Sequence, residues 1–122
     1  MANSNFIKSV KQVVECINET PGAHLLLVSI IPSPENHYNN GPVFRLADDE
    51  MRKLANELAK VSFLDLSKNF LRNRQLKPEL FNQRENTAEK KPVHLSKEGA
   101  AMVATKLRQK CMSIPKNCFN IE

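Results

Sequence analysis

The run His24-Leu25-Leu26-Leu27-Val28-Ser29-Ile30-Ile31, which lies between Gly22 and Pro32, decides the fold. Its apolar residues are continuous instead of falling on every second or every fourth position, and its length is that of a strand. Such runs are typical of strands that are buried on both faces, as in parallel sheets. The sequence therefore predicts an α/β fold, in which helices cover the faces of a parallel sheet.

A second strand and three helices are predicted around this run. The strand is Val61-Ser62-Phe63-Leu64-Asp65-Leu66. Helices are predicted over residues 5–18 and 44–60 from apolar residues at the spacing of one helix face, and a third helix is expected between an N-cap at Ser96 and a stop at Pro115. Their expected buried faces are Phe6, Val10, Val13, Val14 and Ile17; Ala47, Met51, Leu54, Ala55 and Leu58; and Ala100, Val103, Ala104, Leu107 and Cys111.

The segments between these elements are rich in residues that break regular structure. Residues 32–42 contain three prolines and a glycine and are expected to form a loop. Asp48, Asp49 and Glu50 are expected in the first turns of the second helix, where the helix dipole favours anions. A helical turn is expected at residues 67–71, and residues 72–93 are expected to form a long basic loop with one helical turn near residues 78–81. Residues 113–122 are expected to be a frayed tail.

The chain as a whole has the size and composition of one globular domain. It has 122 residues, of which 41% are hydrophobic and 25% are charged. No run reaches the length of a membrane span, no signal peptide is visible, and the three cysteines form no CxxC pair, which indicates an intracellular protein with reduced thiols. Cys16 and Cys111 are expected to be buried. Because two parallel strands make a very small sheet, residues 1–122 are expected to be one incomplete three-layer α/β/α half-domain.

Three pieces of the sequence occur in an order that resembles a known family. They are the run from Leu25 to Pro32, the strand 61–66 followed by Phe70, and Val93-His94-Leu95-Ser96-Lys97-Glu98-Gly99-Ala100. Together they resemble the C-terminal half of the SGNH (GDSL-type) hydrolases, over roughly residues 6–107. The resemblance implies a flavodoxin-like fold and, for the parent family, ester or acyl hydrolysis by a Ser-His-Asp triad. It also implies that His94 stands in the place of the catalytic base and that Gly99 lets the last helix pack closely.

The sequence departs from that family at the residues that carry the reaction. The family has an aspartate three residues before the histidine, whereas this chain has Lys91, whose charge disfavours a protonated imidazole. The Gly-Asp-Ser block of the nucleophile and the Gly-x-Asn-Asp block of the oxyanion hole have no counterpart here. We therefore expect a truncated SGNH-hydrolase-like pseudoenzyme that is inactive alone, with His94 as a vestigial base and no cofactor.

No other residue is a clear replacement for the missing groups. Ser29, Ser33 and Cys16 lack the glycine context of a nucleophile elbow. Asp65 is expected to cap the backbone or to pair near Lys68 or Arg72. No metal site is expected, because the spacing of His24, His37 and His94 does not match that of metal ligands.

Basic residues are concentrated in the second half of the chain. Residues 61–122 contain twelve Lys or Arg and six Asp or Glu, whereas residues 1–60 contain six and seven. The alternative function is therefore an RNA-binding module on a non-catalytic SGNH-like fold, similar in that sense to the C-terminal domain of Oskar. A remnant of a larger gene linked to a mobile element belongs to the first expectation, the inactive hydrolase-like protein. A solvated basic face without a ligand accounts for the same charge. The candidate contact residues are Arg72, Arg74, Lys77, Arg84, Lys90 and Lys91.

The first strand also predicts a protein partner. An unpaired strand edge presents free backbone groups that can bind another chain. Three alternatives for the partner of this chain therefore remain open: no partner, RNA, or a complementing α/β segment. No membrane partner is expected.

Overall fold

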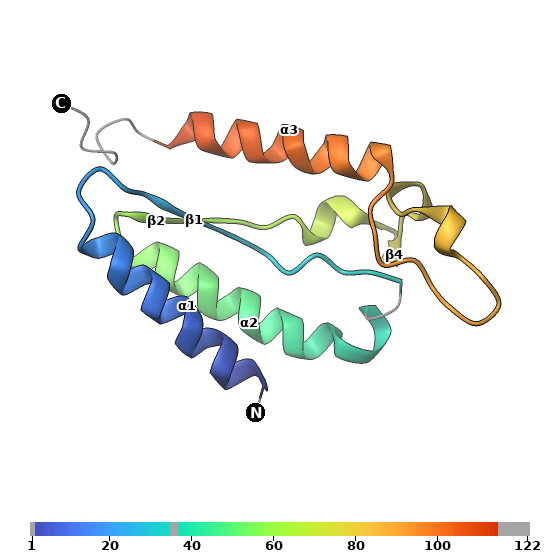
Figure 1. Cartoon of the computed structure of the whole chain (residues 1–122), viewed down its shortest axis with the longest axis horizontal. Helices are drawn as coiled ribbons and strands as arrows, with labels where there is room; N and C mark the ends of the chain where they lie inside the picture. The colour runs from blue at the N-terminus through green and yellow to red at the C-terminus, as the bar shows by residue number, and fades with distance from the viewer. Residues whose placement is uncertain (1, 35–36, 115–122) are drawn as a thin grey trace.

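The computed structural model describes residues 2–34 and 37–114, and the side chains of residues 5–34 and 44–114. A two-stranded parallel sheet lies between two layers of helices, with α1 and α2 on one face and α3 on the other (Figure 1). The main elements are α1 (Ala2–Asn18), β1 (Leu25–Val28), α2 (His37–Glu57), β2 (Val61–Leu64) and α3 (Lys97–Ser113). The predicted mixed α/β class and the parallel pair of strands are confirmed.

The two strands are shorter than predicted because side chains replace the strand ladder at their carboxyl ends. Leu25 pairs with Val61 and Val28 with Leu64. Beyond this pairing, the buried hydroxyl of Ser29 accepts the N–H of Leu66 at 2.8 Å. A backbone group that is hydrogen-bonded to a side chain does not need a partner on a neighbouring strand, so the ladder can end there.

One core cluster joins α1 and α2 to the lower face of the sheet. Its buried members are Val14, Leu27, Met51 and Val61. On the predicted face of α2, Ala47 and Met51 are buried and Leu54 and Ala55 are partly buried, whereas Leu58 packs against the cluster just after the helix ends at Glu57. The predicted face of α1 is only partly covered. Val14 is buried, but Phe6 and Val13 are 39% and 48% exposed.

The start of α2 corrects the sequence prediction. The helix begins at His37 instead of residue 44, within the segment predicted as a loop. Pro42 is the sixth residue of this helix, past the first turn in which a proline is tolerated without loss, so the helix lacks the hydrogen bond that residue 42 would otherwise donate. Because the helix begins this early, Asp48, Asp49 and Glu50 lie in the middle of α2 and not in its first turns.

A second core cluster lies between the sheet and α3. Its buried members are Leu66, Phe70, Leu80 and Phe81, and Met102 and Val103 of α3 pack against it. Ala100, Ala104 and Cys111 are exposed, so the predicted inner face of α3 was wrong for these three residues. The helix is rotated because Gly99 sits directly against the carbonyl of Leu80, where a side chain would not fit.

Residues 72–93 are more ordered than the predicted loop. β3 (Leu71–Arg72) and β4 (Gln75–Leu76) form an antiparallel hairpin, and η2 (Pro78–Leu80) and η3 (Gln83–Glu85) are single 3-10 turns. The turns predicted at residues 67–71 and 78–81 are confirmed, the first as η1 (Ser67–Phe70). The hairpin was missed because its turn residues, Asn73 and Arg74, both take positive φ, which asparagine favours and arginine does not.

The thiols also depart from expectation. Cys16 and Cys111 are both exposed and free, so they are not the buried structural thiols that were predicted. Pro115, Cys118 and the predicted tail from residue 115 lie outside the described residues. Within the described part of the chain, no helix is long and apolar enough to span a lipid bilayer.

Candidate functional site

His94 lies where the chain enters α3, at the end of the molecule where β1 and β2 finish (Figure 1). A short antiparallel contact fixes its backbone: Phe81 and Leu95 form a bridge, and the N–H of Asn82 donates to the carbonyl of His94 at 2.9 Å. Ser96 then caps α3 as predicted, because its hydroxyl accepts the N–H of Gly99 at 3.1 Å. The backbone on both sides of His94 is therefore held in place.

Glu85 supplies the carboxylate that the sequence prediction considered absent. Its Oε2 lies 2.7 Å from Nδ1 of His94, and its Oε1 accepts the backbone N–H of His94 at 3.0 Å. An ionised carboxylate only accepts hydrogen bonds, so Nδ1 carries the proton and the other ring nitrogen, Nε2, is left as the basic atom. This is the role that an acid plays beside the histidine of a catalytic triad.

The position of Glu85 depends on a turn that the sequence alone did not reveal. Asn82 caps η3 by accepting the N–H of Arg84 at 3.1 Å, and Glu85 ends this turn. The hydrogen bond from His94 holds the pKa of Glu85 below its usual range. The side chain of His94 is 76% exposed, so Nε2 faces solvent. Lys91 stands three residues before His94, at the sequence position of the family's acid, whereas the carboxylate that contacts His94 in the structure comes from nine residues upstream.

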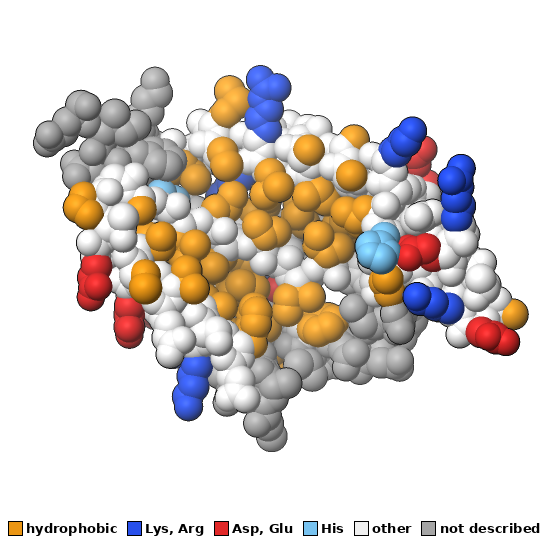
Figure 2. All heavy atoms as spheres, in the orientation of Figure 1, with side chains coloured by type: hydrophobic (Ala, Val, Ile, Leu, Met, Phe, Trp, Pro, Cys, Tyr) orange, Lys and Arg blue, Asp and Glu red, His pale blue; other side chains and the backbone are white. Residues whose placement is uncertain are grey.

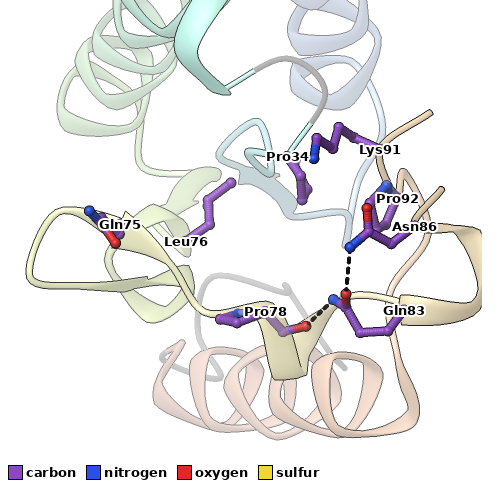
Figure 3. Close-up of a pocket in the computed structure, with 8 residues that line it drawn as sticks. All are labelled: Pro34, Gln75, Leu76, Pro78, Gln83, Asn86, Lys91 and Pro92. Atoms are coloured by element: carbon purple, nitrogen blue, oxygen red, sulfur yellow. Dashed lines mark hydrogen bonds between the residues drawn. The ribbon is translucent and has the colours of Figure 1, made fainter. Parts of the chain in front are cut away.

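Lys91 itself is exposed and lines a pocket of about 260 Å³ to which His94 does not contribute (Figure 3). Gln83 braces the pocket wall by donating to the carbonyl of Pro78 at 2.6 Å, and Asn86 donates to Gln83 at 3.4 Å. Lys91 is the only charged side chain in the described lining, which otherwise consists of Pro34, Gln75, Leu76, Pro78, Gln83, Asn86 and Pro92.

No described hydroxyl or thiol forms a hydrogen bond with the ring of His94. Ser29 is buried and hydrogen-bonded to Leu66, and Ser33 is also buried. Ser96 is engaged as the cap of α3, where it also donates to the carbonyl of Glu79 at 2.6 Å. Over residues 2–34 and 37–114, the hydrogen bonds of the His94 ring involve Glu85 alone. In the described chain, the His94 ring therefore has a carboxylate partner and no hydroxyl or thiol partner.

Asp65 has the capping role that was predicted. Its Oδ1 accepts the backbone N–H of Ser67 at 2.9 Å and the hydroxyl of the same residue. Burial alone would raise the pKa of Asp65, but these hydrogen bonds lower it below its usual value. The predicted ion pair forms with Arg52, at 3.0 Å, and not with Lys68 or Arg72. Among the described residues, no three His, Cys, Asp or Glu side chains cluster in a way that could hold a metal ion.

The six basic residues predicted to contact RNA lie on several short elements between β3 and α3. Arg72 pairs with Glu79 at 2.5 Å, and Arg74 lies in the hairpin turn. Figure 2 shows Lys and Arg side chains on this end of the molecule as separate groups, with acidic side chains between them. The structure therefore places these residues in one region, but on the face shown it does not merge them into a continuous basic patch.

The hydrogen bond between Glu85 and His94 predicts a pH dependence. The pKa of Glu85 is lower in the folded than in the unfolded chain, so its contribution to stability is present above the unfolded pKa and is lost as the pH falls through the folded pKa. Carbon-detected NMR titration of the wild type should give a Glu85 midpoint below the ordinary glutamate value. His94→Ala should raise this midpoint, and Lys91→Ala should leave it in place. An unchanged midpoint in His94→Ala would show that the two side chains do not interact in solution.

Comparison of the chain with protein-family models, with curated proteins and with solved structures found no significant match.

Proposed function

We propose that this chain is an SGNH-hydrolase-like half-domain that carries the histidine and the orienting acid of a hydrolytic site and has no ester turnover by itself. The observation that supports the proposal best is the pair formed by Glu85 and His94, in which both carboxylate oxygens are engaged at 2.7 and 3.0 Å. The motif His94-Leu95-Ser96-Lys97-Glu98-Gly99 and the order of the two parallel strands support it further.

The chemistry of this pair is that of a general base. Nε2 of His94 would take the proton of an attacking hydroxyl, and Glu85 would stabilise the imidazolium that forms. A nucleophile and donors for an oxyanion would have to come from another polypeptide segment, since no described residue of this chain provides them beside His94. Without them, the pair offers little more than a free imidazole in solution.

The topology indicates where a complementing strand would lie. α1 and α2 cover the same face of the sheet (Figure 1). Crossover connections between parallel strands are right-handed, so a strand that led into α1 would lie beside β1, on the side away from β2. Its carboxyl end would then reach the end of the sheet at which His94 sits.

An ester assay tests the proposal. The wild type and His94→Ala should hydrolyse p-nitrophenyl acetate and butyrate at similar rates. Any difference between the two rates should be no larger than the rate given by free imidazole at the same concentration. Glu85→Gln should behave like the wild type in this assay. Saturable turnover that is lost in His94→Ala would contradict inactivity and would imply a nucleophile within this chain.

RNA binding is the second candidate function. It is supported by the absence of ion pairs within the described residues for Arg74, Lys77, Arg84, Lys90 and Lys91, whereas Arg72 is paired with Glu79. Binding of a fluorescent single-stranded RNA should weaken by at least about 10-fold between roughly 50 and 200 mM salt, because phosphate contacts release counterions. Lys90→Glu with Lys91→Glu should abolish it, and Lys8→Glu on α1 should not. If the RNA does not bind to the wild type at low salt, this candidate function is excluded.

A further inference from the structure

The pocket beside the β3–β4 hairpin combines one cation with amide and apolar groups (Figure 3). Its volume is about 260 Å³, and its described lining contains Lys91 and no acidic side chain. Pockets that enclose a drug-sized ligand begin at roughly 300 Å³. The described lining therefore has room for one compact group and carries a positive charge that an anionic ligand would neutralise.

A closed turn brings Asn86 and Lys91 together at this pocket. The backbone N–H of Thr87 donates to the carbonyl of Lys90 at 2.9 Å, and the N–H of Lys90 donates to the hydroxyl oxygen of Thr87 at 3.0 Å. Asn86 and Lys91 are the next residues outward on the two arms of this turn, so they leave it next to each other. Figure 3 shows both side chains on the same side of the pocket. An amide and a cation are thus presented to the same part of the lining.

These two side chains have hydrogen-bonding capacity left over. Lys91 is exposed and forms no ion pair within the described residues. Asn86 uses one N–H on Gln83, at 3.4 Å, which leaves its second N–H and its carbonyl oxygen. The amide of Gln83, in contrast, is committed to Pro78 and Asn86. An anion between Lys91 and Asn86 would therefore gain one charged and one neutral donor.

The apolar part of the lining is aliphatic. The side chain of Pro92 is fully buried, and Pro34 and Leu76 are half-buried. No aromatic side chain belongs to the described lining. Because proteins hold the bases of single-stranded nucleic acids mainly by stacking them on aromatic rings or on arginine, this lining fits an aliphatic group better than a nucleobase.

We infer that this pocket binds the carboxylate end of an N-acylated aliphatic amino acid, either as a free molecule or as the C-terminal residue of a polypeptide. The carboxylate lies between Lys91 and Asn86, where the lysine donates a charge-assisted hydrogen bond. The aliphatic side chain of the ligand contacts Leu76 and Pro92. The partner of the acyl amide is Gln75, whose side chain forms no hydrogen bond with a described residue.

This inference does not rest on the proposed function, because His94 does not line the pocket. It also differs from the RNA candidate, in which Lys90 and Lys91 act together through their charge. Lys90 is the neighbour of Lys91 in the chain and carries the same charge, but it does not belong to the described lining. A comparison of these two lysines therefore separates a pocket from a diffuse basic surface.

NMR titration of the isotope-labelled full chain with N-acetylleucine tests the inference. The amide signals of residues 86–91 and of Leu76 should shift, with a Kd on the order of 1 mM for a ligand of about a dozen non-hydrogen atoms. Lys91→Ala should raise this Kd by at least about 10-fold, because it removes the charged donor. Lys90→Ala is the matched control, and it should change the Kd by less than about 2-fold.

Two further ligands define the chemistry and its source. N-acetylleucinamide, which lacks the charge, should bind at least about 10-fold more weakly than the acid. A pentapeptide that ends in leucine with a free carboxylate distinguishes the sources, since a lower Kd than that of N-acetylleucine identifies a polypeptide terminus and an equal Kd identifies the free acylated amino acid. The inference would be overturned by the absence of shifts, by equal binding of acid and amide, by an unchanged Kd in Lys91→Ala, or by Lys91-dependent binding of adenosine monophosphate in place of N-acetylleucine.

Discussion

Replacement of Gly99 by alanine is expected to destabilise the protein by about 3 kcal/mol, the upper end of the range for overpacked sites. A Cβ at this position would lie 2.1 Å from the carbonyl oxygen of Leu80 and 3.0 Å from its carbonyl carbon. Both are backbone atoms, which cannot rotate away as the end of a side chain can. The same carbonyl accepts the N–H of Ser96 at 3.0 Å, so moving it also disturbs the cap of α3.

Urea denaturation of Gly99→Ala beside the wild type measures this effect. Ala101→Gly, at an exposed site of the same helix, is the control, and it should cost only about 1 kcal/mol through helix propensity. In a variant that still folds, the NMR titration of Glu85 should also change, since the Leu80–Asn82 segment positions His94. If Gly99→Ala were as stable as the wild type, the close contact between α3 and η2 would not exist in solution.

Truncation of Phe81 to alanine is expected to cost about 4 kcal/mol. The side chain is 1% exposed, and its ring centroid lies 5.6 Å from that of Phe70 in the second core cluster. The residue also forms the bridge to Leu95 that holds the entry to α3. Because domains of this size have a total stability of roughly 5–15 kcal/mol, the loss removes a large part of it.

Thermal and urea denaturation of Phe81→Ala provide the measurement. Leu46→Ala is a suitable control, because Leu46 is a large apolar residue of α2 that is 58% exposed. It should change the free energy of unfolding by less than about 0.5 kcal/mol. Equal effects of the two substitutions would mean that Phe81 does not anchor the core.

The parts of the site that sequence spacing could reveal are those that depend on neighbours in the chain. The cap at Ser96 was predicted correctly from the sequence, and the close packing of Gly99, which the family resemblance implied, is observed three residues later. Glu85 was missed, because its distance to His94 is set by the turn at Asn82 and by the bridge between Phe81 and Leu95. A glutamate nine residues before a histidine has no characteristic spacing that would identify it as a partner.

The sequence by itself determined the α/β class, the two parallel strands, the three helices and the residue that enters the last helix. These features follow from apolar periodicity, helix capping and turn residues, which act over a few positions of the chain. Only the tertiary structure decided which apolar faces are covered and that Glu85 meets His94. Those features depend on contacts between segments distant in sequence, and a contact of this kind leaves no periodic signal.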